Sequence, residues 1–197
     1  MTSTTASAGG WRVVDIVVAA VIGVAFGVVF LAWNALYAAT GPIFAAVPAA
    51  QAILYGVWLM PAVLVALIVR RPGAALFGGF AAAAVSVLLG SPYGVDALVS
   101  GAIQGGGAEL GFLLGLYRRW TLPIAVVSGA IAGLAATVHD VVVYYPDTGL
   151  AFWIVYGVAS VASGTLIAGI GSWLLVRALL PTGVLGAFEV GREQREV

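Results

Sequence analysis

Six apolar segments, separated by short polar breaks, dominate the chain. They cover residues 13–36, 50–69, 73–89, 97–117, 122–143 and 151–180. An apolar stretch of about 20 residues is a candidate transmembrane helix. Hydrophobic residues make up 62% of the 197 positions and charged residues only 8%, which is too little charge for a soluble domain of this size. The sequence therefore predicts an all-α membrane protein, a bundle of six transmembrane helices.

The cationic residues fall in every second break between these segments. Cytoplasmic loops of membrane proteins carry an excess of Lys and Arg, and six spans place every cation of this chain on one side. We therefore expect a multi-pass protein of the cell membrane with both termini in the cytoplasm. We expect polar cytoplasmic tails at residues 1–12 and 181–197 and a membrane domain at 13–180. The cations are Arg12, Arg70, Arg71, Arg118, Arg119, Arg177, Arg192 and Arg195.

Composition excludes several kinds of chemistry. The chain has no cysteine and one histidine, His139, so a thiolate or multi-histidine metal site within one chain is excluded, and we expect no metal and no cofactor. It has no lysine, so it lacks the phosphate-binding loop of an ATPase. The net charge of zero offers no nucleic-acid footprint. We expect a protein that is not an enzyme and whose surroundings are the lipid bilayer.

Glu109 interrupts the fourth apolar segment, within the stretch QGGGAELGF at residues 104–112. An ionisable side chain inside a membrane is costly and is a functional-site hypothesis by default. At about 100° per residue, Gly107 and Gly111 lie on the opposite side of the helix from Glu109, so protein is expected to cover both faces. Gly105 and Gly106 leave room beside the carboxylate, which suits a ligand. The alternative is a protonated Glu109 bonded to a backbone carbonyl.

Polar and aromatic residues gather in the half of the bundle predicted to face outward. An interfacial belt of Trp and Tyr explains part of this pattern. A pocket with aromatic walls and one acid would bind a flat, partly cationic heterocycle, because ring faces attract positive charge and a carboxylate accepts charged hydrogen bonds. The alternative for His139 and Asp140 is that they pair with each other or cap their helix. The predicted substrate-binding residues are Glu109, Gln104, Tyr93, Trp33, Tyr55, Trp58, His139, Trp153 and Tyr156.

Small residues recur at intervals of four in the first segment, at Ala19, Gly23 and Gly27. In lipid, such stripes let helices approach closely, so helix packing within the bundle is their ordinary use. A stripe on the first helix can also dock a partner protein. We interpret this stripe as a candidate docking face.

Three blocks of sequence resemble the YkoE family, the substrate-capture (S) components of energy-coupling factor (ECF) transporters. They are GSPYG at 90–94, QGGGAELGF at 104–112 and YRRW at 117–120. The resemblance implies thiamine or its hydroxymethylpyrimidine precursor as cargo. It implies a transmembrane T component and two ATPase subunits as partners. In S components a small-xxx-small stripe on the first helix docks the T component, and Ala19 to Gly23 is similar, with Gly in place of the second Ala.

We therefore predict a membrane-embedded S component of an ECF-type importer, without catalysis of its own. One alternative is a stand-alone proton-coupled transporter that uses Glu109 as its relay. The other is an intramembrane enzyme that uses His139 and Asp140. Neither a second relay carboxylate near Glu109 nor a nucleophile or metal cluster near His139 accompanies these alternatives in the sequence.

Overall fold

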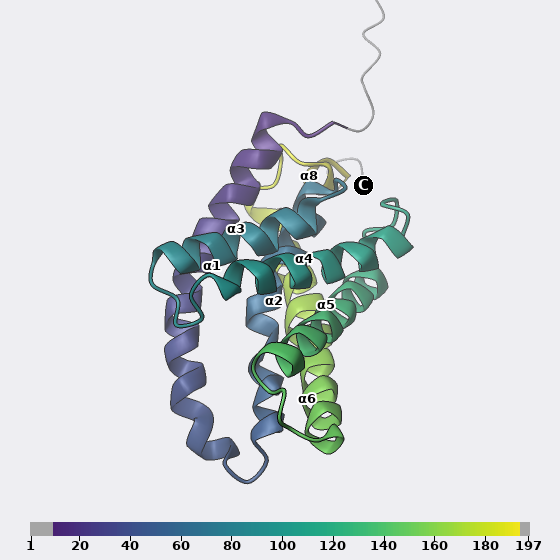
Figure 1. Ribbon diagram of the computed structural model, residues 1–197. Helices are drawn as coiled ribbons and strands as arrows, with labels where there is room; N and C mark the ends of the chain where they lie inside the picture. Colours follow the sequence, from purple (N-terminus) through teal and green to yellow (C-terminus); the bar gives the residue numbers. More distant parts are fainter. Residues whose placement is uncertain (1–9, 194–197) are drawn as a thin grey trace, which may run out of the picture.

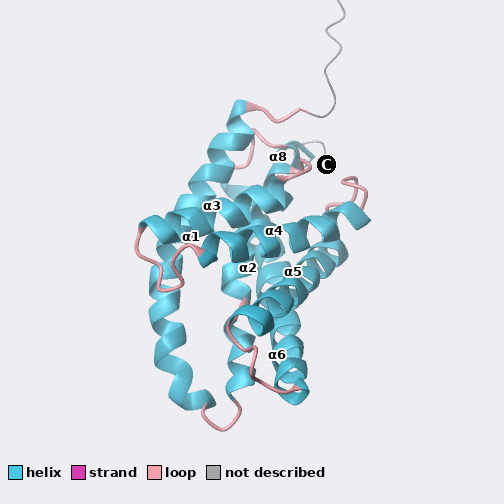
Figure 2. Cartoon of the chain, in the orientation of Figure 1, coloured by secondary structure: helices cyan, strands magenta, loops and turns pink. Residues whose placement is uncertain are grey.

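The computed structural model describes residues 10–193, which form a bundle of helices (Figures 1 and 2). The bundle contains long helices, short 3-10 helices and one π-helical segment, in the order α1 (Val13–Thr40), η1 (Gly41–Phe44), η2 (Pro48–Leu54), α2 (Gly56–Val69), α3 (Ala74–Leu88), α4 (Asp96–Leu114), α5 (Leu122–Val143), α6 (Leu150–Ser163), η3 (Gly164–Gly171), α7 (Ser172–Leu179), η4 (Leu180–Thr182) and α8 (Glu189–Glu193). The expectation of an all-α membrane protein is confirmed.

Five helical stretches are long and apolar enough to cross a bilayer, and α3 is shorter. Its 15 residues rise only about 22 Å, against roughly 30 Å for the hydrocarbon core. In Figure 1, α3 and α4 cross the view at a steep angle to α1. The two ends of the described chain lie together, because Arg12 Nη1 donates to the carbonyl oxygen of Ala187 at 3.2 Å. The six-span count and the cytoplasmic termini stay predictions.

Helix α2 forms the centre of the bundle. All but three of its 14 residues are buried, and the helix is apolar on every side, as expected of a helix surrounded by others. Its start is fixed by the Gly56 N–H, which donates to Ser163 Oγ at 2.8 Å. A Cβ at Gly56 would lie 2.5 Å from the Ser163 carbonyl oxygen, so only glycine allows this approach. Helices α1, α3, α5 and η3 pack around α2.

The small-residue stripe of α1 packs inside the chain. Ala19 is fully buried. A Cβ at Gly23 would lie 2.8 Å from Ala81 Cβ, and one at Gly27 would lie 2.4 Å from Val85 Cγ1. Both glycines therefore serve the contact between α1 and α3, where close backbone approach replaces side-chain packing. The stripe that the sequence predicts as a docking face is in contact with α3 in this structure.

The last apolar stretch is one continuous helical path with a π-helical middle, η3, between α6 and α7. Here η3 packs against α5, and a Cβ at Gly129 would lie 2.2 Å from the Gly164 carbonyl oxygen. The wider turn shifts the helix register, so that α6 and α7 present different faces to the bundle.

The segment predicted as a second polar tail has apolar side chains that pack against the bundle. Leu185, Phe188 and Val190 are buried. Glu189 accepts from Arg71 Nη2 at 3.2 Å, which joins α8 to the connection between α2 and α3. Residues 1–9 and 194–197, which belong to the two predicted tails, lie outside the described residues.

Candidate ligand-binding site

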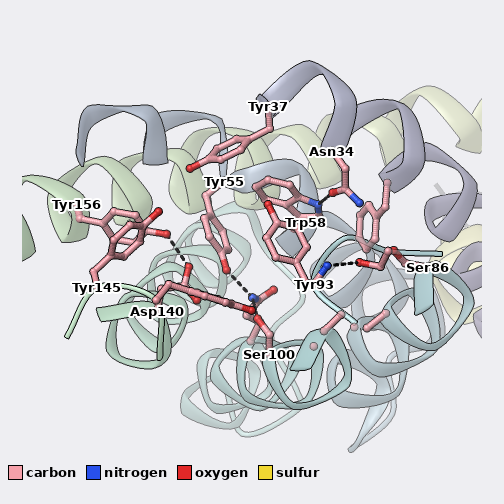
Figure 3. Close-up of a pocket in the computed structure, with 18 residues that line it drawn as sticks. Asn34, Tyr37, Tyr55, Trp58, Ser86, Tyr93, Ser100, Asp140, Tyr145 and Tyr156 are labelled. Carbon is pink, nitrogen blue, oxygen red and sulfur yellow. Dashed lines mark hydrogen bonds between the residues drawn. The ribbon is translucent and has the colours of Figure 1, made fainter. Parts of the chain in front are cut away.

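A cavity lies at the end of the bundle opposite Arg12 and α8. It holds about 180 Å³ of space that water can enter, more than ten times the roughly 10–15 Å³ that one water needs on the same measure. Its walls come from α1, η2 with the start of α2, α3, α4, α5 and α6, together with the connection between α3 and α4 (Figure 3). This is the end that the arginine pattern predicts to face the exterior.

Aromatic rings form most of one wall, with Trp58 at their centre. The Trp58 ring makes edge contacts with Tyr37 at 4.9 Å, Tyr55 at 5.2 Å and Tyr93 at 6.1 Å, measured between ring centroids. Its Nε1–H donates to Asn34 Oδ1 at 3.0 Å, so the indole is held in one orientation (Figure 3). Each edge-to-face contact of this kind stabilises the relative orientation of its two rings by a small free energy. The wall is therefore preorganised for a flat ligand.

Asp140 is the one charged side chain among the described residues that line the cavity. It is 3% exposed. Its Oδ2 accepts from the Tyr156 hydroxyl at 2.5 Å, and its Oδ1 lies 2.8 Å from His139 Nδ1. Asp140 stands seven residues after Gly133, which packs directly on Ser160 of α6, so both lie on the inward face of α5. The cavity therefore contains a fixed carboxylate that protein donors hold from behind.

Gln104 lines the same cavity, a little more than two turns after Asp96 at the start of α4. Its Nε2 amide donates to the Tyr55 hydroxyl at 2.9 Å and to Ser100 Oγ at 2.5 Å. Both of these hydrogen bonds use the amide nitrogen, which leaves the carbonyl oxygen of the side chain to accept from a ligand. Gln104 and Asn34 thus add neutral polar groups to a mainly aromatic wall.

Glu109, which the sequence predicts as the carboxylate of the binding site, does not line this cavity. Its carboxylate lies at the first turn of α3, where the N–H of Gly73 donates to Oε1 at 2.6 Å and the N–H of Ala75 donates to Oε2 at 2.9 Å. Leu76 N–H lies 3.4 Å from the same Oε2. The unpaired N–H groups of a helix start attract negative charge, so this position satisfies the acid without a ligand.

The YRRW block packs close to the same helix start. Phe112 stacks near Trp120 with 5.2 Å between ring centroids, and Tyr117 lies 6.4 Å from Trp120. Burial, then a hydrogen bond to Glu109 and its negative charge, raise the pKa of Tyr117 to about 12. Tyr117 therefore stays a neutral hydrogen-bond donor beside Glu109 at physiological pH. Glu109, Phe112, Tyr117 and Trp120 therefore form one structural cluster outside the cavity.

The structure brings five of the nine predicted residues to the cavity wall and leaves four elsewhere. Gln104, Tyr93, Tyr55, Trp58 and Tyr156 line it. Three aromatic or imidazole side chains lie outside it, in addition to Glu109. Trp33 donates to the Leu54 carbonyl oxygen at 3.1 Å, Trp153 donates to Thr148 Oγ1 at 2.9 Å, and His139 lies behind Asp140.

The mouth of the cavity is bounded by the connection between α3 and α4. Tyr93 in this connection contacts Tyr144 with 6.0 Å between ring centroids, and the Tyr144 hydroxyl donates to Asp96 at the start of α4. Burial raises the pKa of Tyr93 to about 12. The Tyr93 hydroxyl is therefore neutral at physiological pH and can both donate and accept a hydrogen bond.

Asp140 is a cavity residue that the sequence analysis named together with His139, as an ion pair, a helix cap or an enzyme site, but not as a ligand-binding residue. The spacing of Asp140 from Gly133 was the available signal, because a seven-residue interval returns to the same helix face. A matching signal existed for Glu109. Gly101, Gly105 and Glu109 stand four apart, and both glycines contact α3, where a Cβ at Gly105 would lie 2.9 Å from Leu76 Cα. This spacing assigns Glu109 to the α3 contact.

The described residues contain no group of three His, Cys, Asp or Glu side chains arranged to hold a metal ion. At the cavity, one carboxylate is accompanied by phenol, amide and hydroxyl groups. Transition metals prefer imidazole and thiolate ligands. The donor set of the cavity therefore suits an organic ligand.

Comparisons with known proteins agree with this architecture. A family model described as the permease component of an ABC-type cobalt transport system matches residues 14–135. YkoE of Bacillus subtilis (strain 168), named as an HMP/thiamine permease protein, is 34% identical over 191 residues, covering 94% of this chain and 93% of that protein. The chain belongs to the YkoE family of ECF-transporter S components.

A solved structure supports the same assignment. The crystal structure of an S component of an ECF transporter superposes with a TM-score of 0.86 at 33% identity, covering 95% of this chain and 94% of that one. This S component is therefore a multi-pass protein of the cell membrane that takes up a substrate, and it is not an enzyme. The stand-alone proton-coupled transporter is not favoured by these relatives, and Glu109, its supposed relay, is held at the start of α3.

Proposed function

We propose that this S component captures thiamine, and more weakly its hydroxymethylpyrimidine precursor, in the cavity lined by Asp140 and Trp58. The cargo enters from outside the cell and is delivered through a T component driven by two ATPase subunits. The observation that carries the proposal is the single buried carboxylate of Asp140 facing a cavity with aromatic walls.

Charge supports a cationic heterocycle as the cargo. Asp140 is buried, and its attraction for a cation is only weakly screened by water at this depth. The rings of Trp58 and Tyr93 add favourable contacts with a positively charged ring. The thiazolium of thiamine carries a permanent positive charge, whereas hydroxymethylpyrimidine carries none when unprotonated. Tighter binding of thiamine follows from this difference.

The aminopyrimidine ring, which both molecules share, matches the neutral groups of the cavity. Its exocyclic amine is a donor for the Gln104 amide oxygen, and its ring nitrogens are acceptors for N–H groups such as the Asn34 amide. Both amides are anchored through their other ends, by Tyr55 and by Trp58. Anchored partners lose little side-chain freedom when a ligand binds, which favours affinity.

Titration of the purified protein with thiamine and with hydroxymethylpyrimidine tests the proposal. Trp58 lies in the wall, so intrinsic tryptophan fluorescence and calorimetry are both usable readouts. We expect saturable binding of both molecules, tighter for thiamine, and competition between them. Absence of thiamine binding by calorimetry would overturn the proposed cargo.

Uptake into vesicles tests the proposed partners. The chain has no lysine and hence no phosphate-binding loop, so another subunit must supply ATP hydrolysis. We expect thiamine accumulation only when a T component, ATPase subunits and internal ATP are all present. Accumulation by vesicles that contain this protein alone would contradict the proposal and support proton-coupled transport.

A further inference from the structure

His139 lies between two acids from different helices. Its side chain is 4% exposed. Nδ1 lies 2.8 Å from Asp140 Oδ1, and Nε2 lies 3.3 Å from Asp96 Oδ1 at the start of α4. The Tyr144 hydroxyl holds the other oxygen of Asp96. His139 thus connects the cavity carboxylate to the mouth of the cavity without lining the cavity itself.

The contacts of His139 assign a direction to its hydrogen bond with Asp140. An ionised carboxylate only accepts, so Nδ1 must carry the proton in this pair. Nε2 is buried and makes no hydrogen bond of acceptable geometry, even with Asp96 at 3.3 Å. The Nδ1–H bond to Asp140 is therefore the one hydrogen bond that the imidazole makes among the described residues.

Held this way, Asp140 has one oxygen directed by His139 and the other by Tyr156. Each carboxylate oxygen has two lone pairs, so Asp140, which lines the cavity and also bonds Tyr55, can still accept from a ligand. We propose that His139 is a positioning residue for ligand binding, which fixes Asp140 in the orientation that pairs with a cationic ligand. This inference rests on the proposed function, because it requires a ligand that binds through Asp140.

The hydroxyls of Tyr156 and Tyr55 also bind Asp140, and His139 is the partner that lies 2.8 Å from Oδ1. The Tyr156 hydroxyl holds only Oδ2, and the ring of Tyr144 packs edge-on against the imidazole at 5.9 Å between centroids. Loss of His139 would leave Oδ1 of a buried carboxylate without its charged or polar partner, which costs affinity through lost orientation.

Three substitutions at one position separate this role from general packing. The side-chain amide nitrogen of Asn occupies nearly the place of His Nδ1, whereas that of Gln occupies the place of Nε2. We expect His139→Ala and His139→Gln to weaken thiamine binding about tenfold or more, as for loss of a hydrogen bond to a charged group. We expect His139→Asn to remain within about threefold of the parent protein. Val138→Ala, at a neighbouring position that is 59% exposed, is the control.

A double-mutant cycle gives the readout that a purely structural role would not move. In an Asp140→Asn background, His139→Ala should cause less than about a twofold further loss, because the orientation of Asp140 no longer matters. Thermal unfolding of each variant in detergent identifies any that fail to fold, and binding is compared only among the folded ones. If His139→Ala is misfolded, the Asn and Gln variants decide the question.

The outcomes are distinct. Weakened binding by the Ala and Gln variants, rescue by Asn and non-additivity with Asp140→Asn support the proposal. Equal losses in the parent and Asp140→Asn backgrounds, or equal affinity of the Asn and Gln variants, overturn it while leaving thiamine binding intact. A parent protein that does not bind thiamine overturns the proposed function and this inference together.

Discussion

Two acids, the partly buried Glu109 and the buried Asp140, lie at opposite ends of the same bundle and have different partners. Glu109 accepts from backbone N–H groups at the start of α3, at 2.6 and 2.9 Å. Asp140 accepts from the side chains of Tyr156 and His139 at the wall of a cavity. The backbone donors at Glu109 complete a helix end away from the cavity, whereas the side-chain donors hold an acid that lines the cavity. Burial of an acid in a membrane protein therefore indicates a ligand site only when its partners leave part of it free.

The largest expected effect is on the cavity acid. Asp140→Asn should weaken thiamine binding by about 2–4 kcal/mol, because a buried charged pair loses one partner. Calorimetry on folded protein measures this loss. Asp147→Asn, which alters an exposed acid on the same side, is the matched control and should change affinity by less than about twofold. Equal affinity of Asp140→Asn and parent would remove the functional distinction between the two acids.

The second expected effect is on the stability of the other acid's region. Glu109→Gln should lower the free energy of unfolding by about 1–3 kcal/mol, because the start of α3 loses charged hydrogen bonds. Denaturant titration in mixed micelles measures this change. Thiamine affinity should stay within about twofold of the parent value, as Glu109 lies outside the cavity. A large loss of affinity with unchanged stability would reverse the assignment of the two acids.

A smaller effect is expected from the aromatic wall. Tyr93→Leu removes ring contacts to Trp58 and Tyr144 and should weaken thiamine binding by about 0.5–1.5 kcal/mol. Tyr93→Phe keeps the ring and should bind nearly as the parent does. Competition binding with fluorescence detection compares the two. If the Phe variant is as weak as the Leu variant, the hydroxyl matters more than the ring.

The smallest effect is expected at the end of the bundle where α8 packs. Glu189→Gln breaks the ion pair with Arg71, in which the Glu189 side chain is 40% exposed. Exposed ion pairs contribute between about 0 and 1 kcal/mol, so unfolding should change by no more than this, and thiamine binding should not change. Thermal unfolding at low and high salt measures it. A loss of thiamine affinity would show that the two ends of the bundle are coupled.

Much of the fold follows from the sequence, because long apolar segments and placed arginines leave few arrangements open. The sequence also predicts that Glu109 faces one side of its helix and Gly107 and Gly111 the other, because helix periodicity alone determines this. Gly107 and Gly111 contact α5, and Glu109 contacts α3. The shortness of α3 also follows, because the predicted segment 73–89 differs from Ala74–Leu88 by one residue at each end.

The site was predictable only in part, because a periodicity gives the face of a helix but not its neighbour. Gln104 and Glu109 differ by five residues, or about 140° around α4, so they cannot face the same wall. The stripe from Ala19 to Gly27 likewise showed a close contact without showing that α3 would fill it. Which donors meet Glu109 depends on the crossing of α3 and α4, a tertiary property that no local pattern contains.

The walls of the cavity come from α1, α2, α3, α4, α5 and α6, so a ligand bound there contacts six helices at once. Cargo bound in that space would add contacts that link these helices to one another. Bound cargo should raise the free energy of unfolding by about 2.7 kcal/mol at one hundred times the dissociation constant. The melting temperature should rise with cargo concentration accordingly. An empty S component would be the looser molecule, and the full one the stiffer.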